Sequence, residues 1–363
     1  MKVAVAMSGG VDSSTAAYML KSAGHDVIGL SMQMYDNLRH ADSTYGGCCT
    51  IDDLTDAKRV AWKLGIPHFT LNLEANFHEK VIVPFVQSYL AGTTPSPCVL
   101  CNTHVKFDLF HQKAAAIGAE KIATGHYARI VRGGQAPSPV YELRKAKDLA
   151  KDQTYFLFEL TQDQLRDALF PLGDLTKPEV RAIAEEGGLS VARKKESYEI
   201  CFVPQKDGYP AIVEREAGLE PGEGAGEIVD MDGNVVGTHE GYYHFTIGQR
   251  RGLQVGGTPE RTYVIDVNPF TKRVTIGRGS ALEKSELIAD RVHWIRGSAP
   301  AGPIDVAARV RSRQADVAAT VTPLDADRAR VTFAHKLRAI APGQAVVFYD
   351  GDLCLGGGWI AKS

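Results

Sequence analysis

The spacing of apolar residues in the first part of the chain alternates between a period typical of buried strands and one typical of helices. Short apolar runs predict strands over residues 3–7, 27–32, 68–73 and 121–124. Apolar positions three and four residues apart predict one helix that is capped by Asp52 or Asp53 and ends near Gly65, and another over residues 76–90. This alternation is typical of an α/β fold with a parallel sheet and helices on both faces.

The pattern changes in the second part of the chain, where glycine and proline separate short alternating strands. Such strands are expected at 227–230, 235–238, 262–267, 274–277, 306–310, 315–321, 329–333, 344–349 and 353–355. A chain of 363 residues is also longer than the roughly 250–300 residues that one core supports. We therefore expect a catalytic α/β domain over 1–206, a small β-rich central domain over 207–284 and a C-terminal β-barrel over 285–363.

Composition adds few constraints. The net charge is −2, so any nucleic-acid surface must be local. The arginines of the last domain are the candidate, with a solvated face as the alternative. No apolar run reaches the roughly 18 residues that a membrane span needs. We expect a cytoplasmic protein. Its six cysteines are then either packing residues or residues that take part in chemistry.

The first strand leads directly into Ser8-Gly9-Gly10-Val11-Asp12-Ser13, a stretch that favours anion binding. Glycines let the backbone approach a phosphate closely, and unpaired N–H groups at a helix start favour negative charge. The stretch lacks the Gly-Lys-Ser/Thr ending of a Walker loop. It also lacks the Gly-x-Gly-x-x-Gly pattern of a dinucleotide fingerprint. The stretch resembles the pyrophosphate loop of enzymes that split ATP into AMP and pyrophosphate. Because ligands bind beyond the carboxyl ends of parallel strands, Met7, Met32 and Gly125 should surround the same site.

Cysteines form the second informative pattern. Cys98 and Cys101 form a Cys-x-x-Cys pair, and Cys201 follows much later between Ile200 and Phe202. We predict that Cys101 lies near a helix start, where unpaired N–H groups lower the pKa of a thiol. A zinc pair is the alternative, but zinc needs four ligands and the chain has no second Cys-x-x-Cys. Cys201 on its own is typical of a packing residue.

Six motifs appear in one order along nearly the whole chain. They are MSGGVDSS at 7–14, TPSPCVLCN at 94–102, ATGHYAR at 123–129, KDQTYFL at 151–157, EICFV at 199–203 and LGGG at 355–358. Together they resemble the tRNA-specific 2-thiouridylase family. The resemblance implies sulfur replacing the oxygen on carbon 2 of the wobble uridine in tRNA. Since that oxygen is a poor leaving group, ATP would adenylate it so that AMP departs.

The resemblance also implies residue roles. The nucleotide would contact Ala6, Met7, Ser8, Gly9, Gly10, Val11, Asp12, Ser13, Met32 and Gly125. Asp12 would assist through Mg²⁺ at the pyrophosphate. Cys201 would carry sulfur as a persulfide that attacks the activated carbon. Cys101 would release that sulfur, leaving a disulfide between Cys101 and Cys201 that a reductant reopens.

The expected partners are tRNA and an upstream protein that donates persulfide sulfur. The target base must leave its stack before an enzyme can act on it. By resemblance, Ser96, Pro97 and Cys98 contact this base. Further tRNA contacts are implied for His126, Lys151, Asp152, Gln153, Arg311, Ser312 and Gln344. The alternative for His126 is a strand-end histidine that is satisfied within a turn.

One position departs from the family's pattern, because many members carry Asp where this chain has Cys98. That Asp has been assigned an acid or base role, which a thiol cannot simply inherit. Cys98, Cys101 and Cys201 could instead hold an iron–sulfur cluster whose open iron carries the sulfur. We favour the persulfide route. Other readings are a small-molecule or lysidine-type ligase with a pyrophosphate loop, and an RNA-binding redox switch. Cys48, Cys49 and Cys354 have no assigned role.

Overall fold

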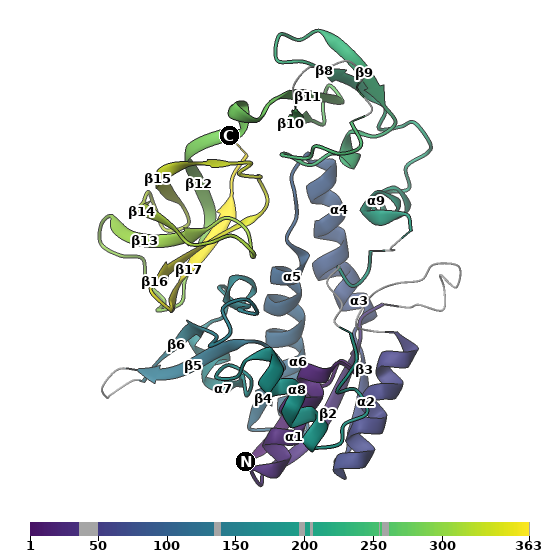
Figure 1. Ribbon diagram of the computed structural model, residues 1–363, viewed down its shortest axis with the longest axis vertical. Coiled ribbons are helices and arrows are strands. Elements are labelled where there is room, and N and C mark those ends of the chain that lie inside the picture. Colours follow the sequence, from purple (N-terminus) through teal and green to yellow (C-terminus); the bar gives the residue numbers. More distant parts are fainter. Residues whose placement is uncertain are drawn as a thin grey trace.

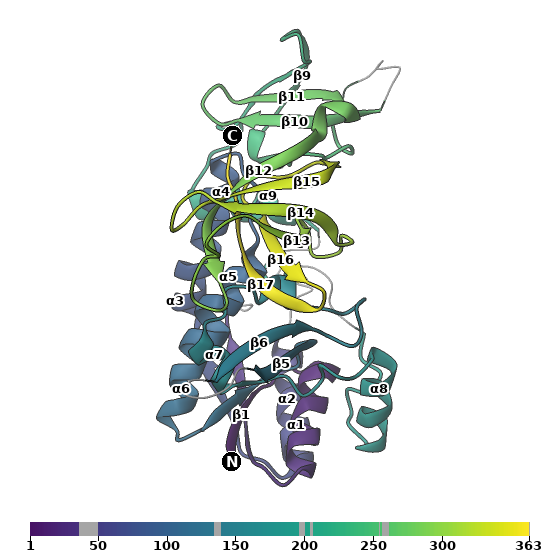
Figure 2. The ribbon, with the colours of Figure 1, turned by 90° about the vertical axis from the view of Figure 1, so that its left-hand side faces the viewer.

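Three sheets divide the chain along its long axis. The computed structural model describes residues 1–35, 50–133, 139–195, 200–203, 206–253, 255 and 261–362. An α/β unit that contains the N-terminus lies at one end, a small sheet at the other, and a β-barrel beside them in the middle (Figures 1 and 2). Among the described residues, no helix has both the length and the apolar character needed to cross a membrane.

The first sheet is parallel, as predicted. Its strand order is β3 (His68–Asn72), β2 (Asp26–Gln33), β1 (Lys2–Ala6), β4 (Lys121–Ala123) and β7 (Ala168–Leu169). Every neighbouring pair runs in the same direction. The first four of these strands overlap the predicted ones, whereas β7 was not predicted, because a strand of two residues shows no period.

Helices cover both faces of this sheet. Val3 and Val5 of β1 pack with α1 (Val11–Ser22), α2 (Ile51–Leu64) and α8 (Lys177–Glu186). Ala4 and Ala6 point to the other face, because side chains alternate along a strand, and join a core that is rich in phenylalanine. The predicted cap of α2 is wrong. Thr50 is the N-cap, and Asp53 completes the capping box from the third helical position.

The core of the second face is built from two helical segments that change pitch. The predicted helix 76–90 consists of α3 (Glu74–Phe77), a π-helical stretch (His78–Ile82) and α4 (Val83–Leu90). Pro84 lies in the first turn of α4, where the missing N–H of proline is tolerated. The next segment is α5 (Pro97–Leu100), a second π-helical stretch (Cys101–Leu109) and α6 (Phe110–Ala116).

A hairpin links the α/β unit to the barrel. β5 (Ala128–Gly133) pairs with β6 (Val140–Lys145), and β6 pairs in turn with β17 (Leu353–Ile360) of the barrel. Residues 134–138, between β5 and β6 in the sequence, lie outside the described residues. The remaining short helices here are α7 (Gln162–Asp167) and a 3₁₀ turn (Thr154–Phe156).

The last two sheets agree with the predicted β-rich regions. The central unit contains α9 (Gly208–Ala217), a 3₁₀ turn (Tyr242–His244), β8 (Gly226–Val229), β9 (Val235–His239), β10 (Thr262–Asn268) and β11 (Arg273–Arg278). After a 3₁₀ turn (Gly279–Leu282), the barrel is formed by β12 (Glu283–Trp294), β13 (Ile304–Arg309), β14 (Val317–Pro323), β15 (Ala329–Arg338), β16 (Ala345–Asp350) and β17. Pairing of β12 with both β15 and β17 closes the barrel. β12 was not predicted as a strand.

Candidate active site

A cavity of about 1380 Å³ lies where the α/β unit meets the barrel. The pyrophosphate-loop residues that follow β1 and Gly125, which follows β4, form one wall, as the parallel-sheet topology predicts. Predicted site residues from distant parts of the chain line the same cavity: Ser8, Gly10, Val11, Asp12, Cys98, Gly125, Lys151, Asp152, Gln153 and Ser312. The fold therefore brings together the expected nucleotide loop, Cys98 and two segments that are expected to contact tRNA.

The pyrophosphate loop has the backbone geometry of an anion site. Gly9 has φ +71°, and a Cβ there would lie 2.0 Å from the carbonyl oxygen of Asp53, so only glycine fits between the loop and α2. Ser13 Oγ accepts from the Ser8 N–H at 3.1 Å and donates to the Gly10 carbonyl at 3.3 Å. α1 begins at Val11 without a side-chain cap. Its first N–H groups can therefore bind an anion.

The end of β4 packs directly against this loop. A Cβ on Gly125 would lie 2.7 Å from the amide nitrogen of Ser13. Ala6 and Met7 are buried beneath the loop. Met32, expected to border the nucleotide, is also buried and does not line this cavity in the described part of the chain.

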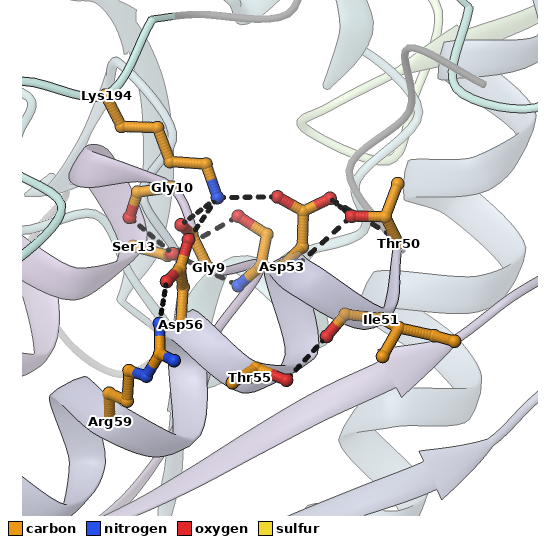
Figure 3. Close-up of polar contacts among 11 residues, drawn as sticks. Gly9, Gly10, Ser13, Thr50, Ile51, Asp53, Thr55, Asp56, Arg59 and Lys194 are labelled. Carbon is orange, nitrogen blue, oxygen red and sulfur yellow. Dashed lines mark hydrogen bonds and ion pairs between the residues drawn. The ribbon is translucent and has the colours of Figure 1, made fainter. Parts of the chain in front are cut away.

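Two lysines that sequence reasoning missed contact the loop or the residues packed against it. Lys177 Nζ bonds both oxygens of Asp12, at 2.7 and 2.9 Å, and Tyr127 Oη donates to the same carboxylate at 2.8 Å. Lys194 Nζ lies 2.7 Å from Asp53 Oδ1 (Figure 3). The one sequence signal for Lys177 is its position at the first residue of α8, where a cation opposes the helix dipole.

The cavity is more cationic than the protein as a whole. Among the described residues, the basic residues that line it are Lys151, Lys177, Lys194, Lys195, Arg309 and Arg313, and the acidic ones are Asp12, Asp53, Asp152 and Asp316. The protein carries a net charge of −2. The positive charge that nucleotide and RNA phosphates require is therefore concentrated locally.

Cys98 and Cys101 lie on one helical segment but are buried to different degrees. The helix starts at Pro97, so Cys98 lies in its first turn and is exposed. Cys101 lies one turn further, buried, with Sγ 3.9 Å from Met34 Sδ. The prediction that Cys101 lies near the helix start is thus corrected, because the helix begins earlier and the first-turn position belongs to Cys98.

The third cysteine packs against the same core. Cys201 is half-buried, and its neighbour Phe202 packs its ring edge-on against Phe77 and Phe85, with centroids 5.6 and 5.0 Å away. Neither Cys101 nor Cys201 is in a disulfide. Within the described residues, Cys98, Cys101 and Cys201 are not gathered into a metal-ligating group. Cys48 and Cys49 lie outside the described residues.

Cys354 is buried within the barrel, as its position in a β pattern suggested. Burial raises the pKa of its thiol to about 12. The thiol therefore stays protonated at neutral pH, which suits a packing residue.

Several expected tRNA residues make contacts inside the protein. The Asp152 side chain is fully buried and accepts from Arg309 Nη1 at 2.9 Å. Gln153 Oε1 accepts from the Tyr127 N–H at 2.9 Å. Arg311 donates to the Ala339 carbonyl. These contacts hold together the segments that border the cavity.

The segment before Cys98 is tied to the barrel. Gln344 Nε2 donates to the carbonyls of Pro95 and Thr94, at 2.7 and 3.2 Å. The Thr94 N–H also donates to the Pro342 carbonyl at 2.8 Å. Ser96 and Pro97 are buried at the end of this segment. The barrel therefore sets the position of the turn that presents Cys98.

His126 is buried behind the cavity. Its Nδ1 lies 2.7 Å from Thr124 Oγ1, and its ring lies 5.8 Å from those of Phe107 and Phe170. Burial, assisted by the charge of Lys106, holds the pKa of His126 well below the ordinary value. The imidazole is therefore neutral at pH 7. This environment matches the alternative of a histidine satisfied within a turn, while the implied tRNA contact stays a prediction.

Fold and site together define a three-domain protein with a pyrophosphate loop. Family profiles match residues 1–205, described as tRNA methyl transferase HUP domain, 219–278, described as tRNA methyl transferase PRC-barrel domain, and 284–360, described as Aminomethyltransferase beta-barrel domain.

Full-length relatives sharpen this class. The tRNA-specific 2-thiouridylase MnmA of Geotalea uraniireducens is 48% identical over 99% of this chain and 94% of its own length. The protein of the same name from Solibacter usitatus is 48% identical over 99% of this chain and 98% of its own length. The chain belongs to the tRNA-specific 2-thiouridylase family. An NMN synthetase from Francisella tularensis aligns over 60% of this chain and 77% of its own length, at 15% identity and a TM-score of 0.33.

Proposed function

We propose that this protein is an ATP-dependent tRNA 2-thiouridylase that replaces the oxygen on carbon 2 of the wobble uridine with sulfur. The observation that carries the proposal is the shared cavity, because the pyrophosphate loop, Cys98 and residues 151–153 line it together. An enzyme that adenylates an RNA base must bring ATP and that base into contact. Its full-length relatives carry the same activity in their names.

The loop suits ATP that is cleaved to AMP and pyrophosphate. The uncapped start of α1 offers backbone N–H groups to phosphate oxygens, and Gly125 lets the neighbouring strand end approach them. When the uracil oxygen attacks the α-phosphate, pyrophosphate leaves and the base becomes bonded to AMP. Asp12, whose carboxylate lines the cavity, is the residue that would hold Mg²⁺, which would neutralise charge on the departing pyrophosphate.

Cys201 and Cys101 divide the sulfur chemistry. A donor protein leaves Cys201 as a persulfide, whose terminal sulfur attacks carbon 2 and expels AMP. The Cys101 thiolate then attacks the inner sulfur of Cys201, which leaves the outer sulfur on the base and forms the Cys101–Cys201 disulfide. An external thiol reductant reopens this disulfide. Cys101 belongs to the phenylalanine-rich core, and Cys201 packs against it.

Cys98 is the cysteine closest to the expected site of base chemistry, since it alone of the three lines the cavity in the described structure. Its place in the first turn of the helix favours the thiolate form. We assign it contact with the extruded base together with Ser96 and Pro97. The persulfide scheme balances without Cys98.

The tRNA would cover the open side of the cavity. Lys151 and Ser312 come from the α/β unit and the barrel respectively, and both line this opening. Basic side chains outnumber carboxylates there, which favours a phosphate backbone. Gln344, Arg311 and Asp152 bind protein groups, so we assign them to holding this surface in shape.

The descriptions of the two matching tRNA methyl transferase domains mention methyl transfer rather than thiolation. The geometry favours thiolation for a chemical reason. A pyrophosphate loop activates an oxygen by adenylation, and a persulfide cysteine supplies the incoming atom. Methyl transfer requires neither a pyrophosphate loop nor a persulfide cysteine.

Nucleoside analysis tests the proposal directly. Unmodified tRNA is incubated with the protein, ATP and a persulfide donor, then digested, and 2-thiouridine and released pyrophosphate are measured. We expect both products in equal amounts, and none of either without ATP.

Variants separate the alternatives. Cys201→Ser should abolish 2-thiouridine, and the matched Cys354→Ala should retain it. Thiouridine formed by Cys201→Ser would overturn the persulfide mechanism. A ligase would form its ATP-dependent product without Cys201, and a redox switch would release no pyrophosphate.

A further inference from the structure

The ammonium groups of Lys177 and Lys194 contact the pyrophosphate loop at two different residues, Asp12 and Gly9. Both side chains line the cavity with Ser8, Gly10 and Asp12. They reach the loop from the end of the α/β unit, more than 150 residues after it in the sequence. Neither lysine has a role in the sequence motifs.

Lys194 is held at the loop by three contacts (Figure 3). Its Nζ donates to the Gly9 carbonyl at 3.1 Å, to Asp53 Oδ1 at 2.7 Å and to Asp56 Oδ2 at 2.6 Å. These three acceptors match the three protons of an ammonium group. The capping box fixes Asp53, because its second oxygen accepts from Thr50 Oγ1 at 2.6 Å. The lysine head is therefore placed beside the glycine where phosphate is expected.

The charge state of Lys194 is also maintained. Burial opposes the charged form, but hydrogen bonds and charge from Asp53 and Asp56 outweigh it and raise the pKa of this lysine. The side chain is still 31% exposed. The ammonium group of Lys194 can therefore release one of its carboxylate partners and bind an anion that enters the cavity.

Lys177 makes a similar contact with the other end of the loop, at Asp12. Its side chain is 9% exposed, and its ammonium lies 5.7 Å from the centre of the Tyr127 ring. Tyr127 also donates to Asp12, which Lys177 binds with both oxygens. A nearly buried lysine that faces a nucleotide cavity is an expensive arrangement for a purely structural ion pair.

We infer that Lys177 and Lys194 bind the β- and γ-phosphates of ATP, with Asp12 and Asp53 as the carboxylates that hold them in place until the phosphates enter. The inference rests on the proposed function, because it needs an ATP site at this loop. It assigns the pyrophosphate end of the nucleotide to the side between the two lysines. The AMP part would then lie toward Cys98 and the tRNA.

Ligand affinities with different numbers of phosphates test this inference. ATP, pyrophosphate and AMP are titrated by calorimetry into the full-length protein and into Lys177→Gln, Lys194→Gln and Lys194→Arg. Lys21→Gln is the matched control, because Lys21 is exposed on α1 and lies outside the cavity lining. Loss of one charged hydrogen bond should weaken ATP and pyrophosphate roughly 10-fold or more, and AMP less than about 2-fold. Lys194→Arg should recover part of the loss.

The alternative is a structural clamp that only shapes the loop. In that case Lys194→Gln would weaken AMP and ATP equally, which would overturn the inference. Failure of the unaltered protein to bind ATP would instead overturn the proposed function itself. The two failures are therefore distinguishable.

A measurement on the unaltered chain removes the dependence on variant folding. Lysine acylation followed by mass spectrometry reports how fast each ammonium reacts. Pyrophosphate should slow acylation of Lys194 relative to Lys21, and AMP should not. Equal protection of Lys194 by both ligands, or by neither, would contradict phosphate binding by this residue.

Discussion

The carboxylate of Asp152 is completely buried against Arg309, whose Nη1 donates to Asp152 Oδ2 at 2.9 Å. This pair joins the α/β unit to β13 of the barrel. Thr154 Oγ1 donates to both oxygens of Asp152, at 3.0 and 2.9 Å. Arg309 pairs on its other side with Asp316. The segment 151–153 at the cavity is thus positioned by a buried ion pair between two domains.

Removing Asp152 should therefore destabilise the protein. Asp152→Ala leaves the Arg309 charge buried with one partner fewer, and breaking such a pair costs about 3–5 kcal/mol. Chemical denaturation measures the loss. Asp163→Asn is the control, since its partner Arg166 is on the surface and exposed pairs contribute less than about 1 kcal/mol. Equal stability of the two variants would show that the buried pair does not hold the domains together.

Gly125→Ala should weaken ATP binding without unfolding the chain. The new methyl group would lie 2.7 Å from the Ser13 amide nitrogen and 2.8 Å from the Asp12 carbonyl carbon, so the pyrophosphate loop must move. Overpacking of this kind costs about 1–3 kcal/mol, or roughly 5- to 150-fold in affinity. Calorimetric titration with ATP measures it. Gly302→Ala has open space at its Cβ and should bind normally.

Gln344→Ala tests whether this residue shapes the site or binds tRNA. The structure predicts loss of two hydrogen bonds to the segment before Cys98, which lowers stability by about 1–3 kcal/mol and reduces kcat. Thermal unfolding and steady-state thiolation report the two effects. Gln112→Ala removes an exposed glutamine contact and serves as control. A raised KM for tRNA with unchanged stability and kcat would favour direct tRNA contact.

The buried His126 should make stability fall in mild acid. Burial lowers its pKa in the folded state, whereas the unfolded chain has the ordinary value near 6.5. The unfolded state therefore binds the proton first, so the contribution of neutral His126 is complete above pH 6.5 and declines as pH falls below it. In urea unfolding measured between pH 5 and 8, the free energy of unfolding should change less steeply with pH for His126→Gln than for the unaltered protein. Identical slopes would mean that His126 does not titrate on unfolding.

The persulfide route predicts activity without iron. In this route the sulfur is carried by Cys201 rather than by a cluster. Protein purified anaerobically should therefore be colourless, contain far less than one iron per chain and still thiolate tRNA with a persulfide donor. An absorption spectrum and an iron assay measure this. Activity that rises in proportion to bound iron would require the cluster mechanism instead.

Local patterns in the sequence were sufficient for the scaffold and for the nucleotide loop. A strand, two glycines and a helix start are encoded within residues 2–22, so the anion site at Gly9 and Gly10 needs no distant contact to be predicted. Alternating periods likewise predicted the parallel sheet and the barrel. The starts of two helices were predicted incorrectly. Thr50 rather than Asp52 or Asp53 caps α2, and the helix that contains Cys101 begins at Pro97.

Only the tertiary structure decided which charges meet. Asp152 and Arg309 are 157 residues apart, and Lys194 and Asp53 are 141 residues apart. No periodic pattern links such positions, because their contact depends on how the hairpin of β5 and β6, the barrel and the end of the α/β unit pack together. Sequence therefore predicted a phosphate loop and candidate reactive cysteines. Packing decided that Cys98 faces the cavity, that Asp152 is buried, and that two lysines lie beside the loop.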